Sequence, residues 1–274
     1  MKLKSLFLAL VVFGVGSWSV LAAETAMEPD GKWQVHDPNR PPPPIVTPGA
    51  AFSQGASAPS DAEVLFDGHG LDKWENDHGG PAVWKTSDDY VESVTPGKTW
   101  AGGIRTKGKW ADFQLHVEWA TPNPPKGTDQ GRGNSGILIN DMYEIQILDN
   151  YENKTYADGQ AAAIYGQKPP LVNACKPPGE WQTYDIIFES PRWNDKGEVV
   201  KKARITVLQN GLAVQNHYEL VGMTDGINPL QPYHKASKYG PPHSPEVFIQ
   251  LQDHNNPVRF RNIWIRSLHL GSND

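Results

Sequence analysis

Two short stretches of the sequence place carboxylate, amide and imidazole groups at every second position. In the stretch YEIQI, Glu144 and Gln146 alternate with apolar residues. In the stretch VFIQLQDH, Gln252 and His254 share one parity. Because successive side chains of a strand point to opposite faces, each stretch predicts a strand with one buried and one polar face. Such a face can bind a polar ligand, although an ordinary solvated strand has the same pattern.

These groups form one site if the two strands are neighbours in a sheet. The pooled candidates are Glu144, Gln146, Gln252, His254 and Arg259, with Asn134 and Asp149 beside them. His254 is the candidate acid or base, because the pKa of imidazole lies near working pH. The alternative for Arg259 is a rim salt bridge of little consequence with Glu144 or Asp149.

The last apolar stretch, RFRNIWI, changes parity along its length. Phe260 is expected to face the core and the flanking arginines to face away from it. That parity conflicts with Ile263 and Ile265, so we expect a β-bulge near Asn262.

Other catalytic signatures are absent from the sequence, which contains no GxSxG, HExxH, Walker loop or GxGxxG. His234 and His243 could contribute to a metal site, but their spacing is not diagnostic. Asp88 and Asp89 are typical of a turn. Cys175 is the only cysteine, which excludes an internal disulfide, and no neighbouring feature marks it as an activated nucleophile.

The elements that must position these groups are short strands. The chain has 274 residues with 26 Gly and 24 Pro, a composition that favours strands and turns over long helices. Apolar and polar residues alternate from Phe113 to Trp119, and Asn210-Gly211 between two apolar runs is a strong hairpin signal. We therefore expect an all-β fold, a jelly-roll β-sandwich of two antiparallel sheets.

The N-terminal part of the chain differs from the rest. Residues 1–23 combine two lysines, a short apolar run and small residues, which predicts a signal peptide, with an uncleaved anchor as the alternative. Residues 24–60 contain RPPPPIVTPG and form a Pro-rich extension or linker, and the folded domain is expected over 61–272. The expected location is the periplasm or the exterior, with no membrane attachment after cleavage. A net charge of −6 argues against nucleic acid as a partner. The oligomeric state is left open.

The order of several short motifs resembles the 3-keto-disaccharide hydrolase domain family. The matching pieces are LFDG, FQLHVEW, NSGI, YEIQILDN, AAIY, PPGEW and LQDHNNPVRFRNIWIR, over about residues 62–270. The leader GKWQVHD with the following Pro-rich run is similar to an extension on some exported members. The resemblance implies a concanavalin-like β-sandwich that acts on oxidised sugars. Glu246–Ile249 departs from the small, Gly-containing run often found there, which leaves the cleft width and the substrate open.

A ketone at C3 of a sugar makes the proton on C2 acidic, because its removal gives an enolate. The C1 substituent can then leave by β-elimination, and addition of water completes a net hydrolysis. Such a site needs a base, an enolate stabiliser and an acid. We hypothesise that His254 is the base or acid, Glu144 the second proton carrier, and Arg259 the enolate stabiliser. A divalent metal ion is an alternative stabiliser, with Glu144 and His254 as its candidate ligands. The candidate substrate-binding residues are Asn134, Gln146, Asp149, Tyr165 and Gln252.

Three other functions fit the same residues. A glycosidase with two carboxylates could pair Glu144 with Glu118 or Asp149 and would cleave unoxidised glycosides. A carbohydrate-binding module without chemistry could use aromatic side chains at the rim, such as Trp100, Trp181 and Tyr165. A structural surface protein could use the Pro-rich leader as a tether.

Overall fold

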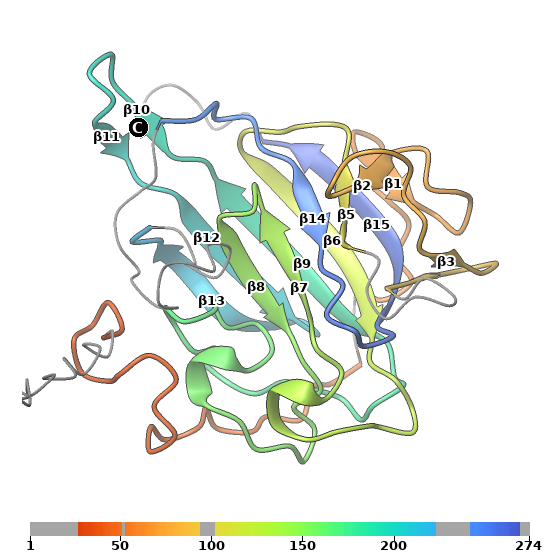
Figure 1. Ribbon diagram of the computed structural model, residues 1–274, viewed down its shortest axis with the longest axis vertical. Helices are drawn as coiled ribbons and strands as arrows, with labels where there is room; N and C mark the ends of the chain where they lie inside the picture. The colour runs from red at the N-terminus through yellow and green to blue at the C-terminus, as the bar shows by residue number, and fades with distance from the viewer. Residues whose placement is uncertain (1–26, 51–52, 94–101, 223–241, 269–274) are drawn as a thin grey trace, which may run out of the picture.

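Two antiparallel β-sheets pack face to face in the computed structural model, which describes residues 27–50, 53–93, 102–222 and 242–268 (Figure 1). In spatial order the five-stranded sheet contains β2 (Trp74–Asn76), β5 (Ile104–Thr106), β14 (Ile249–Leu251), β7 (Ser135–Ile139) and β8 (Tyr143–Ile147). The eight-stranded sheet contains β13 (Leu212–Glu219), β12 (Arg204–Gln209), β9 (Gln182–Glu189), β6 (Phe113–Ala120), β15 (Arg259–Ser267), β4 (Val91–Glu92) and β3 (Lys85–Thr86), with β1 (Glu63–Phe66) also paired to β15. The prediction of an all-β, concanavalin-like sandwich is confirmed.

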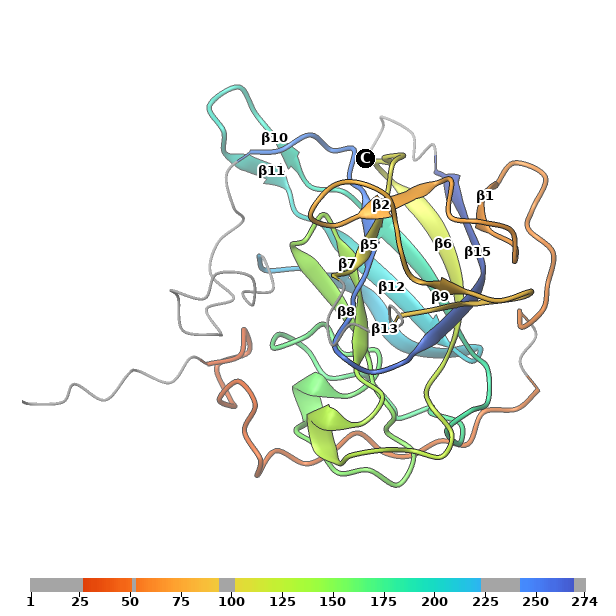
Figure 2. The same ribbon diagram turned by 45° about the vertical axis from the view of Figure 1, so that its right-hand side comes forward.

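The remaining elements are small. A two-stranded ribbon contains β10 (Arg192–Trp193) and β11 (Val199–Lys201). Two short 3-10 helices, η1 (Asp129–Gly131) and η2 (Ala157–Gly159), lie in the loops at one end of the sandwich (Figures 1 and 2). Within the described ranges no helix is long and apolar enough to cross a membrane. The predicted signal peptide, Trp100 and His234 lie outside the described residues.

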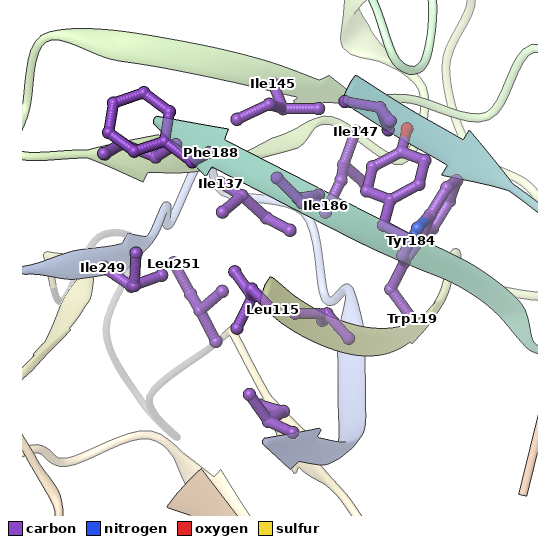
Figure 3. Packing of buried hydrophobic residues seen from close by; sticks show 14 of the residues in the cluster. Leu115, Trp119, Ile137, Ile145, Ile147, Tyr184, Ile186, Phe188, Ile249 and Leu251 are labelled. Atoms are coloured by element: carbon purple, nitrogen blue, oxygen red, sulfur yellow. The ribbon is translucent and has the colours of Figure 1, made fainter. Parts of the chain in front are cut away.

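The alternating residues of β6 show why the sheets pack as they do. Phe113, Leu115, Val117 and Trp119 are fully buried between the sheets. Isoleucines of β7 and β8 meet them from the other side, as Figure 3 shows for Ile137 and Ile145. Burial of each large apolar side chain contributes about 2 kcal/mol, so the period of two in the sequence fixes which face of each strand points inward.

Two local predictions are also confirmed. β12 and β13 form a hairpin, and both turn residues, Asn210 and Gly211, have positive φ (51° and 83°) as the tight turn requires. The register of β15 against β6 shifts between Arg261 and Trp264, and Asn262 has φ of 44° at this bulge. Phe260 faces the core as expected.

The N-terminal extension packs along the domain. Residues 27–50 run past the end of the sandwich that carries η1 and η2 (Figures 1 and 2). Val35 is buried, whereas the Ile45 side chain is 80% exposed and Ile45 forms a β-bridge with Asn173. Pairing of Val46 N–H with the Asn173 carbonyl at 3.0 Å ties the Pro-rich run to the domain.

Candidate active site

The strand register of the five-stranded sheet places polar side chains in rows on its outer face. One row crosses all five strands through directly paired residues, which are Glu75, Arg105, Gln250, Leu138 and Glu144. In the neighbouring row, Gln252 N–H donates to the Gly136 carbonyl at 3.0 Å, and Gly136 pairs with Gln146. We call this surface the cleft face.

A cleft of about 500 Å³ lies on the cleft face. Its lining residues are Asp77, His78, Gly103, Leu138, Asp141, Gln250, Gln252, Asp253, His254 and Asn255. Glycine deepens its floor, because a Cβ on Gly103 would lie 2.6 Å from the Leu251 carbonyl oxygen. A cleft of this size holds a sugar, and its lining offers the hydroxyl partners that a sugar needs.

Glu144 and Gln252 meet across a strand that separates them. The sequence left open whether their strands are neighbours, and the structure places β7 between β8 and β14. The residue of β7 at this point is Gly136, and a Cβ there would lie 2.5 Å from Oε1 of Glu144. The missing side chain leaves room for the Glu144 carboxyl to reach across β7 and form a hydrogen bond with Gln252.

Burial gives the Glu144 carboxyl an unusual affinity for a proton. Removal from water raises its pKa from 4.5 to about 7, and the hydrogen bond from Gln252 opposes this only in part. A carboxyl with this pKa can both accept and donate a proton near neutral pH. Among the candidate site residues, Glu144 is therefore the one whose environment fits proton transfer best.

His254 lies at the exposed margin of the same cleft. It follows β14 and lines the cleft together with Gln252, which itself contacts Glu144. The backbone carbonyl of His254 accepts a hydrogen bond from Asn256 Nδ2 at 2.9 Å, which fixes the local turn. The structure thus brings three predicted residues, Glu144, Gln252 and His254, to one surface.

Two predicted amides are already engaged. Asn134 Nδ2 donates to the Gln130 carbonyl at 2.7 Å, and Gln146 Nε2 donates to Gln130 Oε1 at 3.0 Å. Gln130 belongs to η1, so both amides hold this turn against the end of the cleft face. Asp149 is buried and forms an ion pair with Arg132 at 2.7 Å.

Tyr165 extends the first row beyond β8. Its N–H donates to the Glu144 carbonyl at 3.1 Å, and the preceding Ile164 pairs with Ile145. Since directly opposite residues of an antiparallel pair point to the same face, Tyr165 and Glu144 share the cleft face.

Arg259 is not part of this surface, which corrects the pooled set. It lies on β15 in the eight-stranded sheet, because the link from β14 to β15 crosses from one sheet to the other. There its guanidinium lies 5.5 Å from the Tyr90 ring and 5.4 Å from the Trp181 ring, and Nη2 donates to the Gly179 carbonyl. Parity alone could not reveal this crossing.

The alternative pairs of carboxylates are not brought together either. Glu118 lies on β6 in the eight-stranded sheet, bonded to Arg261 Nε at 2.8 Å, and Asp149 is neutralised by Arg132. Cys175 is half-buried, and burial raises the pKa of its thiol to about 11, which fits a structural role.

Sequence reasoning missed several residues of the cleft. Asp77 and Asp141 both line it, and burial raises the pKa of Asp141. Asp77 Oδ2 accepts from Gly103 N–H at 2.7 Å and so holds the glycine floor in place. The only signal available was their position at the ends of short polar strands, which many solvated residues share.

A divalent metal ion does not fit the described residues. No group of three or more His, Cys, Asp or Glu side chains in the described ranges is arranged to hold one. Of the two candidate ligands, His254 lines the cleft and Glu144 contacts Gln252 beside it, and two ligands are fewer than protein metal sites ordinarily use.

The fold and the cleft define a β-sandwich protein with a polar site on a sheet face. A family model described as a 3-keto-alpha-glucoside-1,2-lyase-like domain matches residues 61–266, and the chain belongs to this family. It is 26% identical over 258 residues to a 3-keto-disaccharide hydrolase of Bacteroides thetaiotaomicron, covering 80% of this chain and 83% of the relative.

Solved structures agree with this membership. A Parabacteroides distasonis protein, named as a proposed glycosyl hydrolase, is 43% identical with a TM-score of 0.69, over 84% of this chain and 93% of that one. A second protein of the same species, with the same kind of name, is 25% identical with a TM-score of 0.53, over 76% and 99% of the two chains.

Proposed function

We propose that this protein cleaves the glycosidic bond of 3-keto-glycosides. The observation that carries the proposal is the Glu144 carboxyl, which reaches across Gly136 to Gln252 with its pKa raised to about 7. Membership of the 3-keto-alpha-glucoside-1,2-lyase-like family and the name of the Bacteroides thetaiotaomicron relative support the substrate class.

The proposed reaction is an elimination followed by hydration. A base takes the proton from C2, and the electrons of that bond form the C1=C2 double bond. The bond between C1 and the leaving oxygen breaks, and this oxygen takes up a proton. Water then adds across the double bond, with hydroxyl at C1 and hydrogen at C2, which gives net hydrolysis. The atoms and electrons balance without an added oxidant or reductant.

Two residues divide the proton transfers in this proposal. Glu144 acts on one proton from its place beside Gln252, where a pKa near neutrality favours exchange in both directions. His254 acts on the other from the margin. Gln252 holds the Glu144 carboxyl in place, and Gln250 and Asp77 are positioned to bind sugar hydroxyls. Arg259 has no role, because its strand belongs to the other sheet.

A turnover assay tests the proposal directly. The purified chain is incubated with a 3-keto-glycoside and, separately, with the unoxidised parent, each with and without a chelator. Cleavage of the keto form alone supports elimination. Cleavage of both supports a two-carboxylate glycosidase, binding without cleavage supports a carbohydrate-binding module, and loss of activity with chelator requires a metal ion that the described residues do not hold.

We also infer export from the signal-like residues 1–23. N-terminal sequencing of the protein recovered from the periplasm or medium should begin near residue 24. A protein that retains Met1 and stays in the cytoplasm would contradict this inference.

A further inference from the structure

The N-terminal extension inserts an imidazole beside the edge of the cleft face. The backbone N–H and the Nδ1 atom of His36 each lie 3.0 Å from the same oxygen, Oδ2 of Asp158. Asp158 is fully buried within η2. The preceding residue, Val35, is also buried, so this part of the extension is docked firmly.

The His36 ring packs against two tyrosines. It stacks on Tyr156 with ring centres 3.9 Å apart and planes 27° apart, and it meets Tyr165 edge-on at 4.9 Å. The two tyrosine hydroxyls share a hydrogen bond of 2.6 Å. The orientation of Tyr165 is therefore set from one side by the ring and the hydroxyl of this small cluster.

Tyr165 in turn adjoins the proposed acid–base residue. Its backbone N–H is bonded to the Glu144 carbonyl, and both side chains project from the cleft face. The chain of contacts thus runs from His36 of the extension, directly and through Tyr156, to Tyr165, which lies beside Glu144 at the end of the first row of the cleft face.

The backbone of His36 indicates that its position is held by these contacts. His36 has φ of 60°, in the left-handed region that costs an ordinary residue about 1 kcal/mol. Such a conformation persists only where the surroundings hold it, and it is frequent at functional sites. An ion pair between Glu28 and Arg40, both residues of the extension, closes the extension on itself around His36.

We propose that His36 is a positioning residue of the substrate site, contributed by the N-terminal extension, and that it holds Tyr165 as an end wall against which a sugar ring packs. This inference rests on the proposed function, since it places the sugar of that reaction on the same cleft face. Aromatic walls suit sugars because their C–H faces pack on the ring while hydroxyls remain free for hydrogen bonds.

The test variant is His36→Asn. Asparagine tolerates positive φ and can still donate to Asp158, so the extension stays docked while the ring is lost. We expect KM for the 3-keto-glycoside to rise about tenfold with kcat changed less than about threefold, because binding rather than chemistry is lost. Asn39→Ala, an exposed change in the same extension, is the matched control and should leave both constants unchanged.

A double-mutant cycle separates positioning from a general loss of packing. If His36 acts through Tyr165, the effects of His36→Asn and Tyr165→Phe on KM are not additive. Additive effects, or a His36→Asn protein with wild-type KM, would overturn the inference. Thermal melting of each variant verifies that the fold is retained.

Calorimetric titration with the unoxidised parent glycoside distinguishes this inference from the proposed function. If the wild-type protein binds a glycoside but cleaves neither form, the proposed function fails, and weaker binding by His36→Asn than by Asn39→Ala still supports the positioning role. If the wild-type protein cleaves the keto form and both variants match it, only the positioning role fails. If it binds neither form, both are wrong.

Discussion

The two outer faces of the sandwich carry similar polar residues but differ in what covers them. On the eight-stranded sheet, His116, Glu118, Asp185 and Arg261 form what we call the covered face. Residues 53–56, the strap, lie over it, with Gly55 N–H donating to Glu118 at 2.5 Å and Ser53 Oγ to Asp185 at 2.8 Å. On the cleft face, Glu144 has Gln252 as its hydrogen-bond partner and an open cleft beside it.

The difference appears in the proton affinities of two glutamates. Burial alone would raise the pKa of Glu118, but hydrogen bonds from His116, Asn262, Gly55 and Arg261 outweigh it and lower the pKa to about 2. For Glu144 the hydrogen bond from Gln252 does not outweigh burial, and its pKa rises to about 7. Hydrogen bonding thus keeps the Glu118 carboxylate ionised, whereas burial leaves the Glu144 carboxyl able to exchange a proton near neutral pH.

The largest contrast is expected in catalysis. Glu144→Gln should lower turnover of a 3-keto-glycoside about 10³-fold, because the amide cannot transfer the proton. The measurement is kcat/KM, with the exposed Glu246→Gln as the matched control. Full activity of Glu144→Gln would remove the basis for assigning the chemistry to the cleft face.

For stability, the larger effect is expected from the glutamate of the covered face. Glu118→Gln should lower the free energy of unfolding by about 3 kcal/mol, because it leaves Arg261 without its buried counter-charge. Urea denaturation measures the loss, and kcat/KM of the folded variant should stay close to wild type. A variant that is stable but inactive would place Glu118 in the chemistry after all.

The two carboxyls should also respond to pH with opposite sign. The folded pKa of Glu144 lies above its ordinary value, so its stabilising contribution is complete below pH 4.5 and is lost as the pH rises to about 7, by up to about 3 kcal/mol. The folded pKa of Glu118 lies below, so its contribution is present above pH 4.5 and is lost as the pH falls to about 2.

Unfolding curves across this range, for wild type, Glu144→Gln and Glu118→Gln, measure these contributions. As the pH rises, the free energy of unfolding of the wild type should fall relative to that of Glu144→Gln. As the pH falls, the free energy of unfolding of the wild type should approach that of Glu118→Gln. Parallel curves for the wild type and Glu144→Gln would show that the Glu144 carboxyl titrates normally.

The smallest effect should follow from Gly136→Ala. The three atoms nearest to the added methyl group would be Oε1, Cδ and Cγ of Glu144, and this side chain can shift, so we expect stability to change by less than about 1 kcal/mol. Displacing the carboxyl should lower kcat about tenfold. An unchanged kcat would mean that contact with Gln252 is not needed.

Strand periodicity was sufficient for the fold but not for the whole site. The alternation in β6 and the Asn210-Gly211 turn are local signals, and both were confirmed. The meeting of Glu144 and Gln252 depends on a glycine in an intervening strand, which no local pattern encodes. Arg259 was misplaced for a different reason, since only six residues lie between it and Gln252 but the chain passes from one sheet to the other within them.

The extension and the strap both contact the domain, so the folding unit begins before the residues that the family model matches. His36 docks at the edge of the cleft face, and Gly55 closes the covered face, yet the family match begins only at residue 61. A fragment expressed from residue 61 would leave Asp158 and Glu118 each without a donor that the intact chain supplies. Expression, fusion to other domains and directed evolution should therefore keep residues 27–60 with the domain that they contact rather than treat them as a disposable linker.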